Sequence, residues 1–287
     1  MEAVLRRVGL IVHPSRDLRG ARATLETWAA RRGTELVMLE PRGEDGAEVA
    51  TCDLVVALGG DGTALAALHR AGPADRPVLG VACGSLGALT ATPASRLEAA
   101  LEEIAQGRWT ARRLPGLEVR RDGEEPLAAV NDVVLVRRGA GQVIVEVDVD
   151  GERYVRFAGD GLVVATPLGS SGYTLASGGP VLAPDAGGSV ITPLAPHGGC
   201  CPPLVITPAQ VVGVTLEPGW GGARLELDGQ PRGAIEPPGP ARFELALRPD
   251  VAAVVELSGG EPALAGLRRR SIVIDSPRIL ARDERAG

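Results

Sequence analysis

The chain of 287 residues contains no lysine, and its 30 basic side chains are all arginine. A Walker A phosphate-binding loop depends on a lysine that reaches the β- and γ-phosphates, and a protein kinase depends on a strand lysine that pairs with the ATP phosphates. Schiff-base and pyridoxal phosphate chemistry also require a lysine amine. The sequence excludes these classes, so any bound phosphate must be held by backbone N–H groups, arginine or a metal ion.

Aromatic residues are scarce as well, with two Phe, two Tyr and three Trp, and the formal net charge is −6. Nucleic-acid-binding domains usually carry a basic patch, and proteins that bind single strands stack the bases on aromatic side chains. The composition therefore predicts that the protein has no nucleic-acid partner.

Long apolar runs are missing too, since none approaches the roughly 18 residues of a transmembrane helix. Arg6 and Arg7 lie where a signal peptide has its apolar segment. The four cysteines, at positions 52, 83, 200 and 201, show no Cys-x-x-Cys spacing. This usage is typical of a compartment that keeps thiols reduced. We expect a cytoplasmic protein without a membrane partner.

The first hundred residues alternate short apolar strands with helical segments. The strands are expected at residues 8–12, 35–39, 53–58 and 77–82. Helices are expected over residues 18–32, after Thr63, and behind a capping box formed by Ser95 and Glu98. Buried strands that alternate with helices are typical of a parallel sheet covered on both faces. The sequence thus predicts a doubly wound α/β domain over residues 1–114.

The pattern changes at the Leu114-Pro115-Gly116 turn, after which alternating apolar residues indicate short strands. These are expected at residues 143–149, 162–165, 204–207, 211–216, 223–227, 243–247 and 251–257. Gly and Pro turns separate them, and no long helix intervenes. We therefore predict an all-β, sandwich-like domain over residues 115–266 and a tail, 267–287, that packs back on the first domain.

The strongest local signal lies where the apolar strand 54–58 runs into Gly59-Gly60-Asp61-Gly62-Thr63. Glycines let the backbone approach a ligand closely, and the following helix adds the positive end of its dipole, so the loop can hold phosphate. A carboxylate repels an anion, but it suits a base that accepts a proton from an attacking hydroxyl. A tight turn in which Asp61 caps the helix is the alternative, and the spacing alone leaves both open.

Two further segments combine polar and small residues. Asn131, the only Asn in the chain, precedes Asp132, and an amide beside a carboxylate can bind ribose hydroxyls or a base edge. An Asx turn that opens a strand is the alternative. Residues 158–180 place Asp160 before a strand and Tyr173 after a Gly/Ser loop, which suits a slot for a planar base. Here the alternative is a hairpin in which Tyr173 fills a gap in the core.

Taken in order, GGDGT at 59–63, ND at 131–132 and DGLVVATPLGSSGYTLASGGP at 160–180 resemble the NAD kinases over nearly the whole chain. The resemblance implies that ATP or polyphosphate, with a divalent metal such as Mg²⁺, phosphorylates the adenosine-ribose 2′-hydroxyl of NAD to give NADP. It implies that Asp61 is the general base. It leaves the ligands of that metal unknown, and it makes NAD and ATP the binding partners. Because some site residues of the family come from a neighbouring subunit, it also implies a homodimer or homotetramer.

The same resemblance implies a set of residues that bind nucleotide or substrate. They are Gly59, Gly60, Gly62, Thr63, Asn131, Asp132, Asp160, Ser171, Gly172, Tyr173, Thr174, Leu175, Ala176 and Gln230.

The chain departs from the family pattern at four positions. Ala66, Ala82, Ala88 and Pro202 stand where the family commonly has a basic residue, Asn, Phe and Arg. These changes remove polar contacts to phosphate. Two alternatives therefore remain open beside an NAD kinase. One is a lipid or sugar kinase built on the same GGDGT loop, and the other is an NAD(H)-binding protein without catalytic activity.

Overall fold

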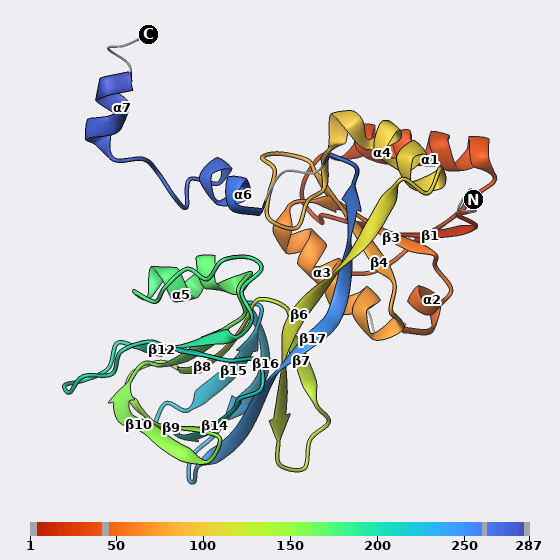
Figure 1. The fold of residues 1–287 in the computed structure, drawn as a ribbon. Helices are drawn as coiled ribbons and strands as arrows, with labels where there is room; N and C mark the ends of the chain where they lie inside the picture. Colours follow the sequence, from red (N-terminus) through yellow and green to blue (C-terminus); the bar gives the residue numbers. More distant parts are fainter. Residues whose placement is uncertain (1–4, 42–45, 260–262, 284–287) are drawn as a thin grey trace.

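Two lobes share a pair of long antiparallel strands, β6 (Trp109–Arg121) and β17 (Ala241–Leu257), in the computed structural model of the chain (Figure 1). The structure describes residues 5–41, 46–259 and 263–283. Both strands run from one lobe into the other, so the domain boundary expected after residue 114 falls inside β6.

The first lobe is built on a parallel sheet in the order β17-β4-β3-β1-β2. Its strands other than β17 are β1 (Arg7–Val12), β2 (Glu35–Met38), β3 (Leu54–Gly59) and β4 (Pro77–Ala82), with β5 (Thr92–Pro93) beside β4. Its helices are α1 (Arg19–Arg32), α2 (Gly46–Ala50), α3 (Asp61–Ala71) and α4 (Leu97–Ala105).

Helices cover both faces of this parallel sheet. Leu54 and Val56 of β3 belong to an apolar cluster with α1 and α4, whereas Val55 and Ala57 belong to a cluster with α3. Alternate residues of a strand point to opposite faces, so the continuous apolar run of β3 is buried on both sides. The prediction of a doubly wound α/β domain is confirmed.

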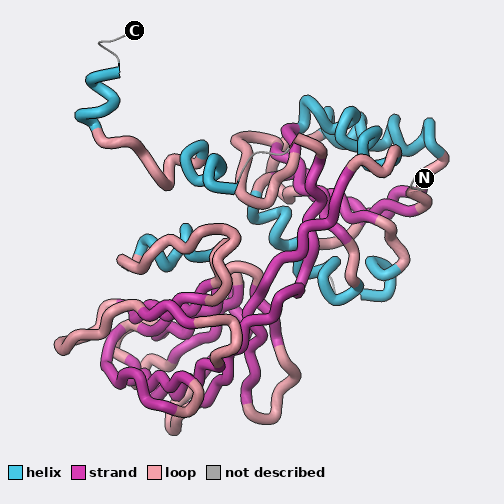
Figure 2. Tube along the Cα trace, viewed as in Figure 1, coloured by secondary structure: helices cyan, strands magenta, loops and turns pink. Residues whose placement is uncertain are grey.

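The second lobe is a sandwich of antiparallel strands, and Figure 2 shows that helix is nearly absent from it. One sheet has the order β13-β12-β11-β8-β15-β16, and it faces the strands β10-β9-β14-β17 of the other. The strands of this lobe are β7 (Leu127–Ala129), β8 (Asp132–Arg137), β9 (Val143–Val149), β10 (Glu152–Gly159), β11 (Gly161–Ala165), β12 (Ser189–Leu194), β13 (Leu204–Ile206), β14 (Val211–Glu217), β15 (Ala223–Leu227) and β16 (Gln230–Ile235). Val143, Val145 and Val147 alternate into the core between the sheets, as their spacing predicts. The all-β, sandwich-like second lobe is confirmed.

The strands expected at residues 243–247 and 251–257 form one strand, β17. A register shift between Arg248 and Ala252 lets the pairing with β6 continue past the intervening turn-like sequence. Beyond the shift, Ala253 and Val254 pair with β4 of the first lobe. One sheet therefore extends through both lobes.

The C-terminal segment carries two short helices, α6 (Ala263–Arg269) and α7 (Pro277–Asp283). Leu267 of α6 is buried and Arg269 reaches the first lobe, whereas α7 points away from both lobes (Figure 1). Ile279 and Leu280 of α7 are exposed to solvent. No helix in the described part of the chain has the length and apolar character that a membrane span requires.

Candidate active site

The GGDGT segment connects β3 to α3, and Asp61 is the first residue of the helix. A side chain at Gly59 would place its Cβ 2.2 Å from Thr63 Oγ1, so the close turn requires glycine. Gly60 precedes the helix in an extended conformation and provides no side-chain cap. The α3 N-terminus therefore points its backbone N–H groups at the loop, which suits an anion.

The Asp61 carboxylate is held by the loop that follows β4. Its Oδ2 accepts a hydrogen bond from the Ala88 N–H at 2.8 Å, and its Oδ1 accepts one from the Leu89 N–H at 2.9 Å. Because these donors lie in the β4–β5 loop, Asp61 does not cap its own helix, and that alternative interpretation is wrong. The loop uses the backbone of Ala88, so the departure from the family pattern at this position leaves the contact intact.

Gly87 determines how closely this loop approaches Asp61. A Cβ at Gly87 would lie 1.9 Å from Asp61 Oδ1, so the carboxylate or the loop would have to shift. The Gly87 N–H donates to Thr90 Oγ1 at 2.7 Å. Sequence reasoning missed Gly87, although the glycines of Gly84-Ser85-Leu86-Gly87 were a visible signal of close backbone approach.

A second group of contacts centres on Asp228, in the turn between β15 and β16. Its carboxylate accepts hydrogen bonds from the backbone N–H groups of Val130, Asn131 and Asp132 at 2.8, 2.6 and 3.0 Å. The Asp228 side chain is completely buried, and His69 Nε2 of α3 lies 2.6 Å from its Oδ2. Sequence reasoning missed Asp228 and His69, because no local signal connects either residue with Asn131 and Asp132.

Asn131 and Asp132 lie beneath the loop after β11. The Asn131 carbonyl accepts the Thr166 N–H at 2.9 Å, and a Cβ at Gly169 would lie 2.1 Å from that carbonyl oxygen. Asn131 Oδ1 is buried and has no hydrogen-bond partner among the described residues, so Asn131 forms no Asx turn. Burial, followed by the charges of Asp228 and Glu226, raises the pKa of Asp132 to about 7.

The Gly/Ser loop that follows β11, together with the next residues, contains both exposed and buried positions. Ser171, Gly172, Leu175 and Ala176 are exposed or half-buried around the short helix α5 (Tyr173–Ala176), whereas Thr174 is buried. Tyr173 is 42% exposed, so its ring does not fill a gap in the core, and that alternative is wrong. Gln230 begins β16 and is exposed beside the Asp228 turn.

Asp160 lies at the other end of the strand pair from Asn131. In the β8–β11 pairing, Gly161 is opposite Val136 and Ala165 is opposite Asp132. Five residues of strand span about 17 Å at roughly 3.3 Å each. Asp160 and Asp132 are therefore separated by nearly the length of the strand within one chain.

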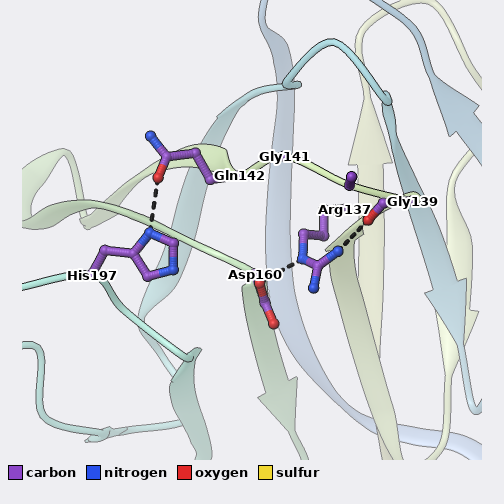
Figure 3. A pocket seen from close by; sticks show the side chains of 7 residues that line it. Arg137, Gly139, Gly141, Gln142, Asp160 and His197 are labelled. Carbon is purple, nitrogen blue, oxygen red and sulfur yellow. Dashed lines mark hydrogen bonds and ion pairs between the residues drawn. The ribbon is translucent and has the colours of Figure 1, made fainter.

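Asp160 helps to line a surface pocket at this end of the sandwich (Figure 3). Arg137 Nε donates to Asp160 Oδ1 at 2.5 Å, and the guanidinium also donates to the Gly139 carbonyl. His197 Nδ1 and Gln142 Oε1 are 2.8 Å apart on the opposite side of the pocket. An adjoining pocket shares Arg137 and Asp160 and adds other residues, among them Tyr173, Ser177, Ala195 and Arg224.

Two family models and many curated proteins match this chain. The chain matches the ATP-NAD kinase N-terminal domain over residues 42–109 and the ATP-NAD kinase C-terminal domain over residues 130–252. The NAD kinase of Koribacter versatilis is 31% identical over 242 residues, which are 79% of this chain and 85% of that protein. The NAD kinase of Heliobacterium modesticaldum is 41% identical over 184 residues, which are 62% of this chain and 65%, just under two thirds, of that protein.

Two solved structures share the fold. Yeast NADH kinase complexed with NADH has a TM-score of 0.81 at 20% identity, covering 95% of this chain and 89% of that one. An NAD kinase from Archaeoglobus fulgidus in complex with ATP has a TM-score of 0.75 at 23% identity, covering 93% of this chain and all of that one. With both domains matched and with relatives above 30% identity, this chain belongs to the NAD kinase family.

Proposed function

We propose that this protein is an NAD kinase in which Asp61 is the general base. The adenosine-ribose 2′-hydroxyl of NAD attacks the terminal phosphorus of ATP or polyphosphate, and its proton passes to the Asp61 carboxylate. A bond forms between the ribose oxygen and phosphorus, and the bond from phosphorus to the bridging oxygen breaks. The products are NADP and ADP, or a polyphosphate shortened by one unit.

The observation that carries the proposal is the setting of Asp61. Each carboxylate oxygen accepts one N–H from the β4–β5 loop, and the acid stands at the N-terminus of α3. A carboxylate has about four acceptor positions, so two fixed bonds leave room for a substrate hydroxyl. The helix N-terminus favours the phosphates of the donor beside this base.

The substrate side of the site is supported by Asn131 and Asp132. Asn131 Oδ1 is buried without a hydrogen-bond partner among the described residues. Leaving a buried polar atom unpaired costs about 1–3 kcal/mol, so such an atom favours a ligand that supplies a donor. An adenine amino group or a ribose hydroxyl would do so.

The phosphoryl donor and its metal are part of the proposal. No group of three or more His, Cys, Asp or Glu side chains that could hold a metal occurs among the described residues. Mg²⁺ is commonly bound by one or two carboxylates together with substrate phosphates. Asp61 fits that arrangement, and the remaining ligands would come from the donor. A bound divalent cation would neutralise charge on the phosphoryl group.

We also propose a homo-oligomer and a cytoplasmic location. Asp160 lies about 17 Å from Asp132 along the β8–β11 pair. Asp160 would therefore act in the site of a neighbouring subunit, at the nicotinamide end of NAD. The four cysteines are all unpaired, which fits a reducing compartment.

The test is a coupled dehydrogenase assay for NADP with purified protein, NAD, ATP and Mg²⁺. Asp61→Asn should lower the rate about 10²–10⁴-fold, as the loss of a positioned base does. Asp75→Asn is the control, because Asp75 is an exposed acid of the same lobe that pairs with Arg113. Phosphorylation of a diacylglycerol or a sugar without NADP formation would overturn the proposal. NAD binding without turnover would instead identify a non-catalytic binding protein.

A further inference from the structure

The C-terminal helix α6 contacts the loop that holds Asp61. The Arg269 guanidinium donates one hydrogen bond to the Leu86 carbonyl and another, at 3.1 Å, to the Gly87 carbonyl. Figure 1 shows α6 beside the α/β lobe, far along the chain from β4. Arg269 thus bridges two parts of the sequence that are 182 residues apart.

The Gly87 carbonyl and the Ala88 N–H belong to the same planar peptide group. Arg269 binds the oxygen of this peptide group, and the Ala88 N–H of the same group donates to Asp61 Oδ2 at 2.8 Å. A guanidinium on the carbonyl oxygen polarises the peptide and strengthens the N–H as a donor. The orientation of the Asp61 carboxylate is therefore connected to Arg269 through one rigid unit.

The neighbouring peptide is held in the same way. Arg269 binds the Leu86 carbonyl, and the N–H of that peptide, which belongs to Gly87, donates to Thr90 Oγ1. Both peptides are fixed at their oxygen and at their nitrogen. Since Gly87 leaves no room between the loop and Asp61, a small shift of the loop must move the carboxylate.

The two arginines that flank Arg269 make different contacts. Arg268 pairs with Asp275 at 2.9 Å, and Arg270 donates to the Gly266 carbonyl at 3.2 Å, so both interact within the C-terminal segment. Arg268 and Arg270 are therefore matched controls, with the same charge and nearly the same position.

We propose that Arg269 is a positioning residue for phosphoryl transfer, which fixes the β4–β5 loop and through it the Asp61 base. The inference rests on the proposed function, and it makes the C-terminal segment part of the catalytic apparatus. A displacement of a reacting group by about 1 Å can cost 10²-fold in rate. Arg269→Ala should lower kcat by about ten- to a hundredfold and leave KM for NAD within about twofold. Arg269→Lys should recover part of the loss, because an ammonium binds one carbonyl where the guanidinium binds two.

The decisive experiment is a double-mutant cycle with Asp61→Asn. If Arg269 acts through Asp61, Arg269→Ala should cause no further loss in the Asp61→Asn background. Arg268→Ala should retain the wild-type kcat. An equal fold-loss of kcat from Arg269→Ala in the wild-type and Asp61→Asn backgrounds would overturn the inference. Equal kcat values for Arg269→Ala and Arg268→Ala would overturn it as well.

Amide hydrogen exchange tests the same contact without reference to activity. Arg269→Ala and Arg269→Lys should both increase the exchange of the Ala88 and Leu89 amides, whereas Arg268→Ala should not. Unchanged exchange at these two amides would overturn the inference even if kcat fell. If the wild-type protein made no NADP, the proposed function would fail, but the exchange result would still decide whether Arg269 fixes the β4–β5 loop against Asp61.

Discussion

His69 Nε2 lies 2.6 Å from Asp228 Oδ2, and this contact links the two halves of the site. His69 belongs to α3, the helix that begins at Asp61, whereas Asp228 holds the backbone of Asn131 and Asp132. Eight residues of helix span about 12 Å at roughly 1.5 Å each. The contact therefore sets the spacing between the base and the segment that would bind the nucleoside.

Replacement of His69 should weaken NAD binding more than it slows chemistry. His69→Ala removes the contact, and because Asp228 keeps its three backbone donors we expect a stability loss of only about 1 kcal/mol. KM for NAD should rise by about tenfold, which corresponds to ~1.4 kcal/mol. Steady-state kinetics and thermal unfolding measure the two effects. His69→Gln, which keeps a hydrogen-bond donor, should lie close to wild type, and an unchanged KM in His69→Ala would contradict the linkage.

Asp132 should make stability depend on pH. Its pKa is raised from 3.8 to about 7 in the folded protein, first by burial and then by the charges of Asp228 and Glu226. The folded state therefore binds the proton more tightly than the unfolded state. The contribution to stability is complete below pH 3.8 and is lost as the pH rises through 7.

Urea unfolding at pH 5 and pH 8 measures this effect. Two pKa units lie between pH 5 and the folded value of about 7. At ~1.4 kcal/mol per unit, wild type should lose at most about 3 kcal/mol over this interval because of Asp132. Asp132→Asn should remove most of that loss. An equal pH dependence in variant and wild type would show that Asp132 is not the source.

Gly87→Ala should inactivate the enzyme without unfolding it. The added Cβ would lie 1.9 Å from Asp61 Oδ1, so the carboxylate or the loop must move. We expect a rate loss of about 10²-fold or more, as misplacement of a catalytic group produces. Gly20→Ala in α1 is the control, because nothing lies within 4 Å of a Cβ there. NADP formation and the unfolding temperature should be measured together, and full activity in Gly87→Ala would refute the close contact.

Subunit mixing should reveal whether Asp160 acts in a neighbouring subunit. Asp61→Asn and Asp160→Asn should each lose activity when pure. If each site takes Asp61 from one chain and Asp160 from the other, one of the two sites in a mixed dimer has both acids intact. Random pairing makes about half of the dimers mixed, so about a quarter of the activity should return. The measurement is NADP formation after the two variants are unfolded and refolded together. No recovery would place both acids in one chain's site.

The local sequence pattern was sufficient to predict the α/β first lobe, the β-sandwich second lobe and the close turn at Asp61. The continuous apolar run 54–58 predicts a central strand, and the glycines around Asp61 predict the close turn at its end. Residue type singled out Asp61, Asn131 and Asp132, the resemblance to the NAD kinases assigned their roles, and those roles stay predictions. The Arg248-Pro249-Asp250 sequence reads as a turn, so β17 was divided into two strands, and only its pairing with β6 keeps it continuous.

The supporting contacts could not be predicted because their partners are distant in the sequence. Asp228 holds residues 96 to 98 positions away. The importance of Ala88 lies in its N–H, and a backbone donor leaves no trace in side-chain chemistry. The roles of Asp228 and Ala88 both depend on contacts between distant parts of the folded chain.

The strand shared by the lobes also restricts the order in which the chain can fold during synthesis. Val254 of β17 pairs with Val78 of β4, so the part of the β4 edge that β5 does not cover has no partner until the ribosome has made more than 170 further residues. An unpaired strand edge favours association with other chains. A fragment that ends after α4 should therefore associate with other chains more readily than the full chain does.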